Sequence, residues 1–295
     1  MSATDLPGTH APLAPLAPIV YEPIVRAALA EDFGLGGDIT SEATIPEGRR
    51  ARAALVARAP GVLAGVHVAL AAFVMLDPQA SIADVRRDGD ALDAGERIAT
   101  VACDARALLG AERTALNLLS HLCGVATMTA RYVAAVRGTR ARVCETRKTL
   151  PGLRALEKYA VRAGGGHNHR FRLDDAILIK DNHIAIAGGV RAALAGARGR
   201  AGHLVCVEIE VDTLAQLDEV LACGGADTIL LDNFARAELV EAVRRTAGHA
   251  TLEASGGVSL ETVAEIAATG VDVISVGALT HSVAALDIGL DMSDA

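Results

Sequence analysis

From residue 141 onward, short apolar runs alternate with longer segments in which apolar residues recur every three or four positions. The apolar runs predict β-strands, and the longer segments predict helices between them. The predicted strands are Arg142–Glu145, Ala176–Lys180, Leu204–Glu210, Thr228–Asp232, Thr251–Ala254 and Asp272–Val276, and the clearest helices are Thr213–Cys223, Arg236–Thr246 and Leu260–Ala268. The last four strands recur about every 22 residues, which is typical of βα units in a parallel sheet.

The βα pattern occupies residues 121–280 and predicts an open, incomplete (β/α) barrel, because its six strands are fewer than the eight of a closed barrel. A Rossmann-like doubly wound sheet is the alternative. Residues 21–120 have a different pattern, with strands expected at Ala53–Arg58 and Arg97–Val101, a helix over Val66–Leu76 and another helix from Ala105. This pattern predicts a separate α+β domain, so we expect an α/β protein of two domains.

The two ends of the chain lie outside these predicted domains. Residues 1–20 repeat Ala-Pro-Leu units without the basic start and continuous apolar stretch of a secretory signal, which predicts a flexible tail. Residues 281–295 form a C-terminal segment, and we expect it to pack back on the N-terminal domain. The most apolar run, Gly61–Leu76, is shorter than the roughly 20 residues of a membrane span. It predicts a buried helix and no membrane contact.

Composition narrows the class of protein. The chain has 295 residues, of which 51% are hydrophobic and 22% charged, a balance typical of a globular protein with a large core. Its 36 acidic residues outnumber 28 basic ones, and the net charge of −8 disfavours nucleic acid as a partner. The five cysteines form no Cys-x-x-Cys pair and lie in apolar sequence, which indicates reduced core thiols and a cytoplasmic protein.

Basic residues concentrate in one part of this acidic chain. Between Arg140 and Lys180 there are ten lysines and arginines against four acidic residues, and all three lysines of the chain fall there. Lys158 shares a helical segment with other cations, which indicates a solvated face. The remaining cations flank predicted strands or glycines, and such a group is suited to a small polyanion. These residues are Arg147, Lys148, Arg170 and Lys180.

The other strand ends carry acidic or glycine-rich sequence. Glu210 and Asp232 end two neighbouring strands and are candidate ligands for Mg²⁺, although an ion pair with the nearby cations is the simpler alternative. The next two strands end in Ser255-Gly256-Gly257 and Val276-Gly277-Ala278. Small residues at these positions let backbone N–H groups approach a phosphate. The carboxyl ends of the strands therefore predict one common site.

Three alternatives exist for these residues: a zinc site, a Schiff-base aldolase and a protein that only binds its ligand. His167, His169 and His183 have no standard zinc spacing, so a zinc site is disfavoured. A Schiff-base aldolase using Lys180 at a strand end is the more serious rival enzyme. A protein that only binds its ligand is a third possibility.

Several motifs together resemble the quinolinate phosphoribosyltransferase family. They are Glu112-Arg113-Thr114 with Asn117, Glu145-Thr146-Arg147-Lys148-Thr149, Gly164-Gly165-Gly166 with Asn168-His169-Arg170, Lys180-Asp181-Asn182-His183, Leu231-Asp232-Asn233-Phe234, Glu253-Ala254-Ser255-Gly256-Gly257 and Ser275-Val276-Gly277. The resemblance spans about residues 20–290. The Thr-Arg-Lys-Thr and Asn-His-Arg segments are specific to this family.

The resemblance implies an N-terminal α/β sandwich domain, an open α/β barrel and a homodimer with active sites shared between subunits. It implies Mg²⁺-dependent transfer of phosphoribosyl from phosphoribosyl pyrophosphate to quinolinate, giving nicotinate mononucleotide, pyrophosphate and CO₂ in NAD biosynthesis. By similarity, the carboxylates of quinolinate are held by Arg113 from the other subunit with Arg147, His169, Arg170 and Lys180, and Thr146 is a further substrate-binding residue. The catalytic set is Lys148, Glu210 and Asp232, the last two also binding the metal, and the 5-phosphate contacts Ser255, Gly256, Gly257, Val276, Gly277 and Ala278.

Overall fold

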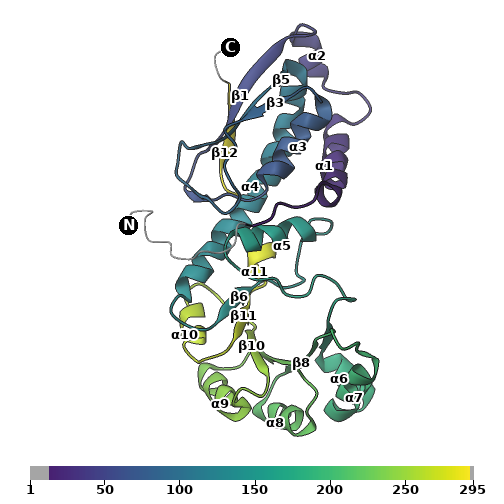
Figure 1. Ribbon diagram of the computed structural model, residues 1–295, viewed down its shortest axis with the longest axis vertical. Coiled ribbons are helices and arrows are strands. Elements are labelled where there is room, and N and C mark those ends of the chain that lie inside the picture. The colour runs from purple at the N-terminus through teal and green to yellow at the C-terminus, as the bar shows by residue number, and fades with distance from the viewer. Residues whose placement is uncertain (1–12, 293–295) are drawn as a thin grey trace. The chain divides into compact units, whose positions relative to one another are not determined.

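The computed structural model describes residues 13–292 (Figure 1). The chain folds into two compact units and crosses between them four times. One unit comprises the chain up to Ala130, Thr149–Gly165 and the residues from Ser282, and the other comprises Arg131–Lys148 and Gly166–His281. Segment Thr149–Gly165, which the sequence pattern placed in the 121–280 domain, thus groups with the first unit.

The first unit is built on an antiparallel sheet with the strand order β12-β1-β5-β3. Strand β1 (Arg50–Ala57) pairs on one side with β5 (Arg97–Asp104) and on the other with β12 (Ile288–Met292), so the C-terminal segment completes this sheet. The other elements are β2 (Gly61–Val62), β3 (Ser81–Ala83), β4 (Ala91–Leu92), α1 (Pro18–Phe33), α2 (Ile39–Thr44), α3 (Val66–Leu76), α5 (Arg154–Ala163) and α4 (Ala105–Ala135), whose last residues belong to the second unit.

Helix α3 forms the centre of this unit because its sequence is almost entirely apolar. It packs against α1 and β5, and its residues from Val66 to Phe73 are largely buried. Helix α1 begins at Pro18, a residue favoured in the first turn of a helix because it lacks the N–H group that would stay unpaired there. The helix therefore starts inside the expected 1–20 tail, of which residues 1–12 lie outside the described part of the chain.

The second unit contains six parallel strands in the order β6-β11-β10-β9-β8-β7. They are β6 (Arg142–Cys144), β7 (Ile177–Ile179), β8 (Val207–Val211), β9 (Thr228–Asp232), β10 (Thr251–Ser255) and β11 (Val273–Ser275). The helices are α6 (Asp181–Ala187), α7 (Val190–Arg200), α8 (Leu214–Cys223), α9 (Arg236–Thr246), α10 (Val263–Ala267) and α11 (Ala278–His281). Strands β6 and β7 form the two edges, so the predicted open barrel is confirmed (Figure 1).

Two expectations need correction. Strand β8 begins at Val207 and not at Leu204, because the N–H of Val205 bonds to Gly202 O in a turn and Leu204 is exposed. All five cysteines are free, but Cys206 is exposed and not in the core. Burial raises the pKa of Cys103 to about 11 and that of Cys123 to about 12, so these thiols stay protonated. No helix among residues 13–292 is long and apolar enough to cross a membrane.

Lys158 corrects the prediction of a solvated cationic face on α5. Its relative exposure is 0%, and every residue from Leu156 to Val161 is buried, whereas Arg162 on the same helix is exposed. The prediction failed because it assumed an amphipathic surface helix, while this turn of α5 is enclosed all round. Lys158 is therefore part of the core of the first unit.

We predict that Lys158→Ala destabilises the protein, because truncating a long buried side chain leaves a cavity. Comparable core truncations cost about 2–5 kcal/mol. Chemical denaturation measures the free energy of unfolding. The exposed Arg162→Ala is the matched control and should change it little. Equal effects of the two substitutions would show that Lys158 is not a core residue.

Candidate active site

The parallel strands of the second unit bring their carboxyl ends to one edge of the sheet. Glu210 lies near the end of β8, Asp232 ends β9 and Ser255 ends β10. Lys180 directly follows β7 and caps α6, where its backbone N–H donates to His183 Nδ1 at 3.0 Å. The strand ends that the sequence singled out thus share one edge, and each is positioned by its own short strand.

Lys180, Glu210 and Asp232 form an acidic part of this edge. Lys180 Nζ lies 2.7 Å from Glu210 Oε2. The ion pair that was the simpler alternative to a Mg²⁺ ligand role for Glu210 is therefore present. Burial and the nearby carboxylates of Glu210 and Asp212 raise the pKa of Asp232, against the opposing effect of Lys180. Crowded carboxylates of this kind fit a hard divalent cation such as Mg²⁺, which binds oxygen ligands and would relieve their repulsion.

Arg147 and Arg170 form the basic part of the site. Burial, and after it the positive charge of Arg147, lower the pKa of Arg170. Arg170 Nη1 donates to Ala176 O at 3.0 Å, but in the described part of the chain the Nε atoms of Arg147 and Arg170 are buried without a hydrogen-bond partner. Buried donors without partners are costly, so this arrangement favours an anionic ligand that bonds to both.

The turn after β6 presents Lys148. Its backbone N–H donates to Thr146 Oγ1 at 3.0 Å, and its carbonyl accepts from Thr280 Oγ1 at 2.7 Å. A Cβ atom at Gly277 would lie 3.1 Å from Lys148 Cδ and from His281 Nε2. Gly277 therefore gives room to the Lys148 side chain, which is exposed at the start of α11.

Asn233 is a site residue that the sequence analysis did not select. Its backbone has φ +56°, its N–H donates to Ser255 O at 2.9 Å, and its Nδ2 donates to Asp232 Oδ2 at 2.7 Å. Gly256 has φ +91°, and a Cβ there would lie 2.6 Å from Asn233 Cγ. Asn233 thus joins the acidic end of β9 to the Ser-Gly-Gly segment after β10. Its signal in the sequence was its place in the motif Leu231-Asp232-Asn233-Phe234, beside the candidate metal ligand Asp232.

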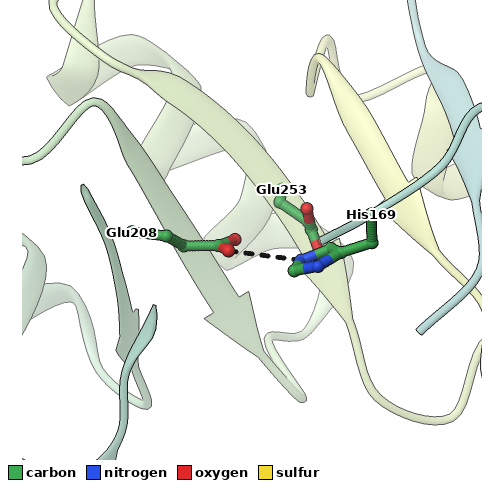
Figure 2. A group of neighbouring side chains, drawn as sticks. All are labelled: His169, Glu208 and Glu253. Atoms are coloured by element: carbon green, nitrogen blue, oxygen red, sulfur yellow. Dashed lines mark ion pairs between the residues drawn. The ribbon is translucent and has the colours of Figure 1, made fainter. Parts of the chain in front are cut away.

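His169 lies in a second acidic group, further inside the sheet (Figure 2). Its Nε2 is 3.2 Å from Glu208 Oε2 and 3.4 Å from Glu253 Oε1. Its Nδ1 accepts the Arg170 backbone N–H at 2.9 Å, and its own backbone N–H donates to Glu145 Oε1 at 3.1 Å. Figure 2 shows the Glu208 side chain reaching across to the His169 ring beside Glu253. Glu208 and Glu253 were missed because acidic residues inside short strands were not expected to be buried.

The two glutamates favour a proton on the facing nitrogen of His169. Burial lowers the pKa of His169, but hydrogen bonds and charges from Glu208 and Glu253 outweigh it and raise that pKa. Burial also raises the pKa of Glu208. Because Nδ1 accepts the Arg170 N–H, the ring proton lies on Nε2, which faces the two carboxyl groups. Nitrogen and carboxylate atoms within 4.8 Å of one another also have the chemistry of a transition-metal site.

The other candidate residues include two histidines, Arg113 and Gly257. His183 caps α6 and His167 is exposed, and neither belongs to the potential metal-ligating group formed by the described residues. Arg113 lies exposed on α4, in the first unit. Gly257 has φ +60° and open space around its missing side chain.

We predict that Gly256→Ala destabilises the protein more than Gly257→Ala. Both place alanine at positive φ, which costs about 1–2 kcal/mol. Gly256→Ala adds an overlap with Asn233, and such overpacking costs about 1–3 kcal/mol more. Chemical denaturation of the two variants measures the difference. Equal losses would mean that Asn233 is not held against the Ser-Gly-Gly segment.

Comparison with known proteins gives a family for this architecture. Residues 38–123 match the family "Quinolinate phosphoribosyl transferase, N-terminal domain", and residues 125–291 match "Quinolinate phosphoribosyl transferase, C-terminal domain". The nicotinate-nucleotide pyrophosphorylase [carboxylating] of Mycobacterium leprae is 52% identical over 276 residues, which cover 91% of this chain and 95% of that protein. A probable nicotinate-nucleotide pyrophosphorylase [carboxylating] of Bacillus subtilis is 45% identical over 263 residues, covering 89% and 90%.

Solved structures agree. The crystal structure of NadC from Streptococcus pyogenes superposes with a TM-score of 0.90 at 40% identity, covering 95% of this chain and all of that one. The nicotinate-nucleotide pyrophosphorylase of Francisella tularensis gives 0.90 at 36% identity, with 97% of this chain covered. Sequence and fold therefore agree over both units, and the chain belongs to the quinolinate phosphoribosyltransferase family of enzymes.

Proposed function

We propose that this protein transfers the phosphoribosyl group of phosphoribosyl pyrophosphate to quinolinate and releases CO₂, forming nicotinate mononucleotide and pyrophosphate for NAD biosynthesis. The observation that carries the proposal is the pair of neighbouring arginines, Arg147 and Arg170, whose buried Nε atoms have no partner among the described residues. A ligand with two carboxylates supplies acceptors for both. The names and family of the relatives support this choice of dicarboxylate.

Quinolinate occupies the basic part of the site in this proposal. Arg147 and Arg170 bind its carboxylates, and each charge-assisted hydrogen bond is worth about 1.5–3 kcal/mol. Lys180 contacts the acidic edge through its ion pair with Glu210. Arg113 completes the carboxylate site from the other subunit of a homodimer, as the family resemblance implies.

Phosphoribosyl pyrophosphate occupies the strand-end edge. Glu210 and Asp232 are the residues that would hold Mg²⁺, which supplies positive charge to the pyrophosphate. Lys148 extends from the turn after β6 and neutralises the same leaving group. Backbone N–H groups of Ser255-Gly256-Gly257 and Val276-Gly277-Ala278 cradle the 5-phosphate, where Asn233 fixes the first of these segments.

Charge determines the order of bond changes. The bond from the anomeric carbon to pyrophosphate breaks as the ring nitrogen of quinolinate forms its bond to that carbon. The alkylated nitrogen is positive, and its charge stabilises the electron pair that stays on the adjacent ring carbon when the carbon–carboxylate bond breaks and CO₂ leaves. The ring carbon then takes up a proton, which restores the neutral C–H of nicotinate mononucleotide. The arginines hold the ring so that its nitrogen faces the sugar.

The Schiff-base alternative is disfavoured by the position of Lys180. Its Nζ is 2.7 Å from Glu210 Oε2. A Schiff-base lysine needs a free amine to attack a carbonyl, and here the amine is engaged in an ion pair.

We predict that the protein uses quinolinate at least about tenfold better than nicotinate in kcat/KM, because nicotinate lacks one carboxylate and thus one charge-assisted contact. Pyrophosphate release with each acid, with and without Mg²⁺, measures this. Comparable turnover of nicotinate would contradict a site for two carboxylates and favour a base-salvage reaction.

We predict that Lys148→Ala lowers kcat and kcat/KM by similar factors of about 100, because Lys148 stabilises charge that develops as pyrophosphate leaves. Initial rates over both substrate concentrations measure these constants. The control is Arg191→Ala, which removes an exposed cation from α7. A change confined to KM would assign Lys148 to ground-state binding.

We predict that inactive Arg113→Ala and Lys148→Ala proteins regain activity when mixed. In a homodimer with shared sites, a mixed dimer carries both substitutions in one site and leaves the other intact. With random exchange, activity should approach about a quarter of the wild-type value. Size-exclusion chromatography and tagged subunits verify the exchange. Mixed dimers without activity, or an active monomer, would contradict the shared site.

A further inference from the structure

We propose that His169 is a positioning residue and not a ligand of the substrate: anchored by Glu208 and Glu253, it fixes the backbone at Arg170 and so directs the Arg170 guanidinium to the bound carboxylate. This rests on the proposed function for the nature of the ligand. It departs from the role that family resemblance implies for His169, which is direct contact with quinolinate.

The first argument is that both ring nitrogens are already engaged. Nδ1 accepts the Arg170 N–H at 2.9 Å, and Nε2 lies 3.2 and 3.4 Å from the carboxylates of Glu208 and Glu253. Imidazole has only these two polar atoms. A carboxylate ligand at Nε2 would have to displace Glu208 and would lie against the like charges of both buried glutamates.

The second argument is burial. The side chains of His169, Glu208 and Glu253 are 12%, 9% and 4% exposed, and the two glutamates come from β8 and β10 in the interior of the six-stranded sheet. His169 therefore attaches its segment to two central strands (Figure 2). This is the environment of an anchor and leaves little surface for a ligand.

The third argument is the need for such an anchor. Arg170 lies in a stretch, residues 168–176, that has no helix or strand. Its position depends on side-chain bonds: Nδ1 of His169 receives its N–H, and its own Nη1 bonds to Ala176 O. Asp175 accepts the N–H groups of Phe171 and Arg172 in the same stretch. Without the His169 side chain, the Arg170 N–H loses its acceptor and the segment loses its attachment to β8 and β10, while the backbone N–H bonds of residues 167 and 169 to Val143 O and Glu145 Oε1 remain.

A double-mutant cycle separates positioning from direct binding. We expect His169→Asn to weaken quinolinate binding about tenfold and Arg170→Ala to weaken it more, with the double variant no weaker than Arg170→Ala within about a factor of two, because His169 acts through Arg170. Calorimetric titration and quinolinate KM are the measurements. Losses that multiply in the double variant would show that His169 binds the substrate independently, and would overturn the proposal.

The anchor itself is tested by Glu253→Gln, which keeps the side-chain shape and removes its charge. We expect a higher KM for quinolinate and an unchanged KM for phosphoribosyl pyrophosphate, which also shows that the variant is folded. The matched control Glu265→Gln, on exposed α10 residue Glu265, should change neither constant. An unchanged quinolinate KM in Glu253→Gln would contradict the anchor. So would a transition metal that copurifies at one ion per chain and is lost from Glu253→Gln.

A readout independent of the substrate keeps the two proposals distinguishable. Amide hydrogen exchange at Arg170 should be slow in the wild-type protein and at least about tenfold faster in His169→Ala, because Nδ1 is the acceptor of that amide. Unchanged exchange would overturn the positioning role. Failure of the wild-type protein to turn over quinolinate would instead contradict the proposed function while leaving this result to decide the role of His169.

Discussion

Two buried guanidinium donors without partners are the constraint on which the rest of the site depends. Arg147 and Arg170 each have a buried Nε without a hydrogen-bond partner among the described residues. A buried, unpaired donor costs free energy, which is recovered when an anion binds to it. The scaffold must therefore hold both side chains in place. Strand β6 and its turn do this for Arg147, and the His169 anchor does it for Arg170.

The acidic edge is formed by a separate set of residues from the basic part of the site. Glu210 and Asp232 lie near the carboxyl ends of adjacent strands, and Glu208 and Glu253 lie further back along β8 and β10. The alternation of side chains along β8 is important here, because Glu208 and Glu210 are two residues apart and so point to the same face. One face of one strand thus supplies both an anchor carboxylate and a candidate metal ligand.

The sequence predicted the architecture because βα periodicity is a local signal. The strands β9 and β10 and the helices α3 and α9 appeared almost at their true bounds, and strand-end residues shared an edge as parallel pairing requires. Burial of charged groups was not predictable in the same way. Lys158, Glu208 and Glu253 are buried by tertiary neighbours, and the role of Asn233 depends on a glycine more than twenty residues away, Gly256. Local pattern carries no information on such contacts.

The central claim is that Arg147 and Arg170 bind a ligand with two carboxylates. Stabilisation of the folded protein by such a ligand tests this most directly. A ligand at 100 times its Kd stabilises the native state by about 2.7 kcal/mol. At constant ionic strength, quinolinate should raise the unfolding temperature by several degrees and nicotinate at the same concentration much less. The difference should disappear in the Arg147→Ala/Arg170→Ala double variant. Equal shifts with both acids, or a quinolinate shift that persists in the double variant, would contradict the account.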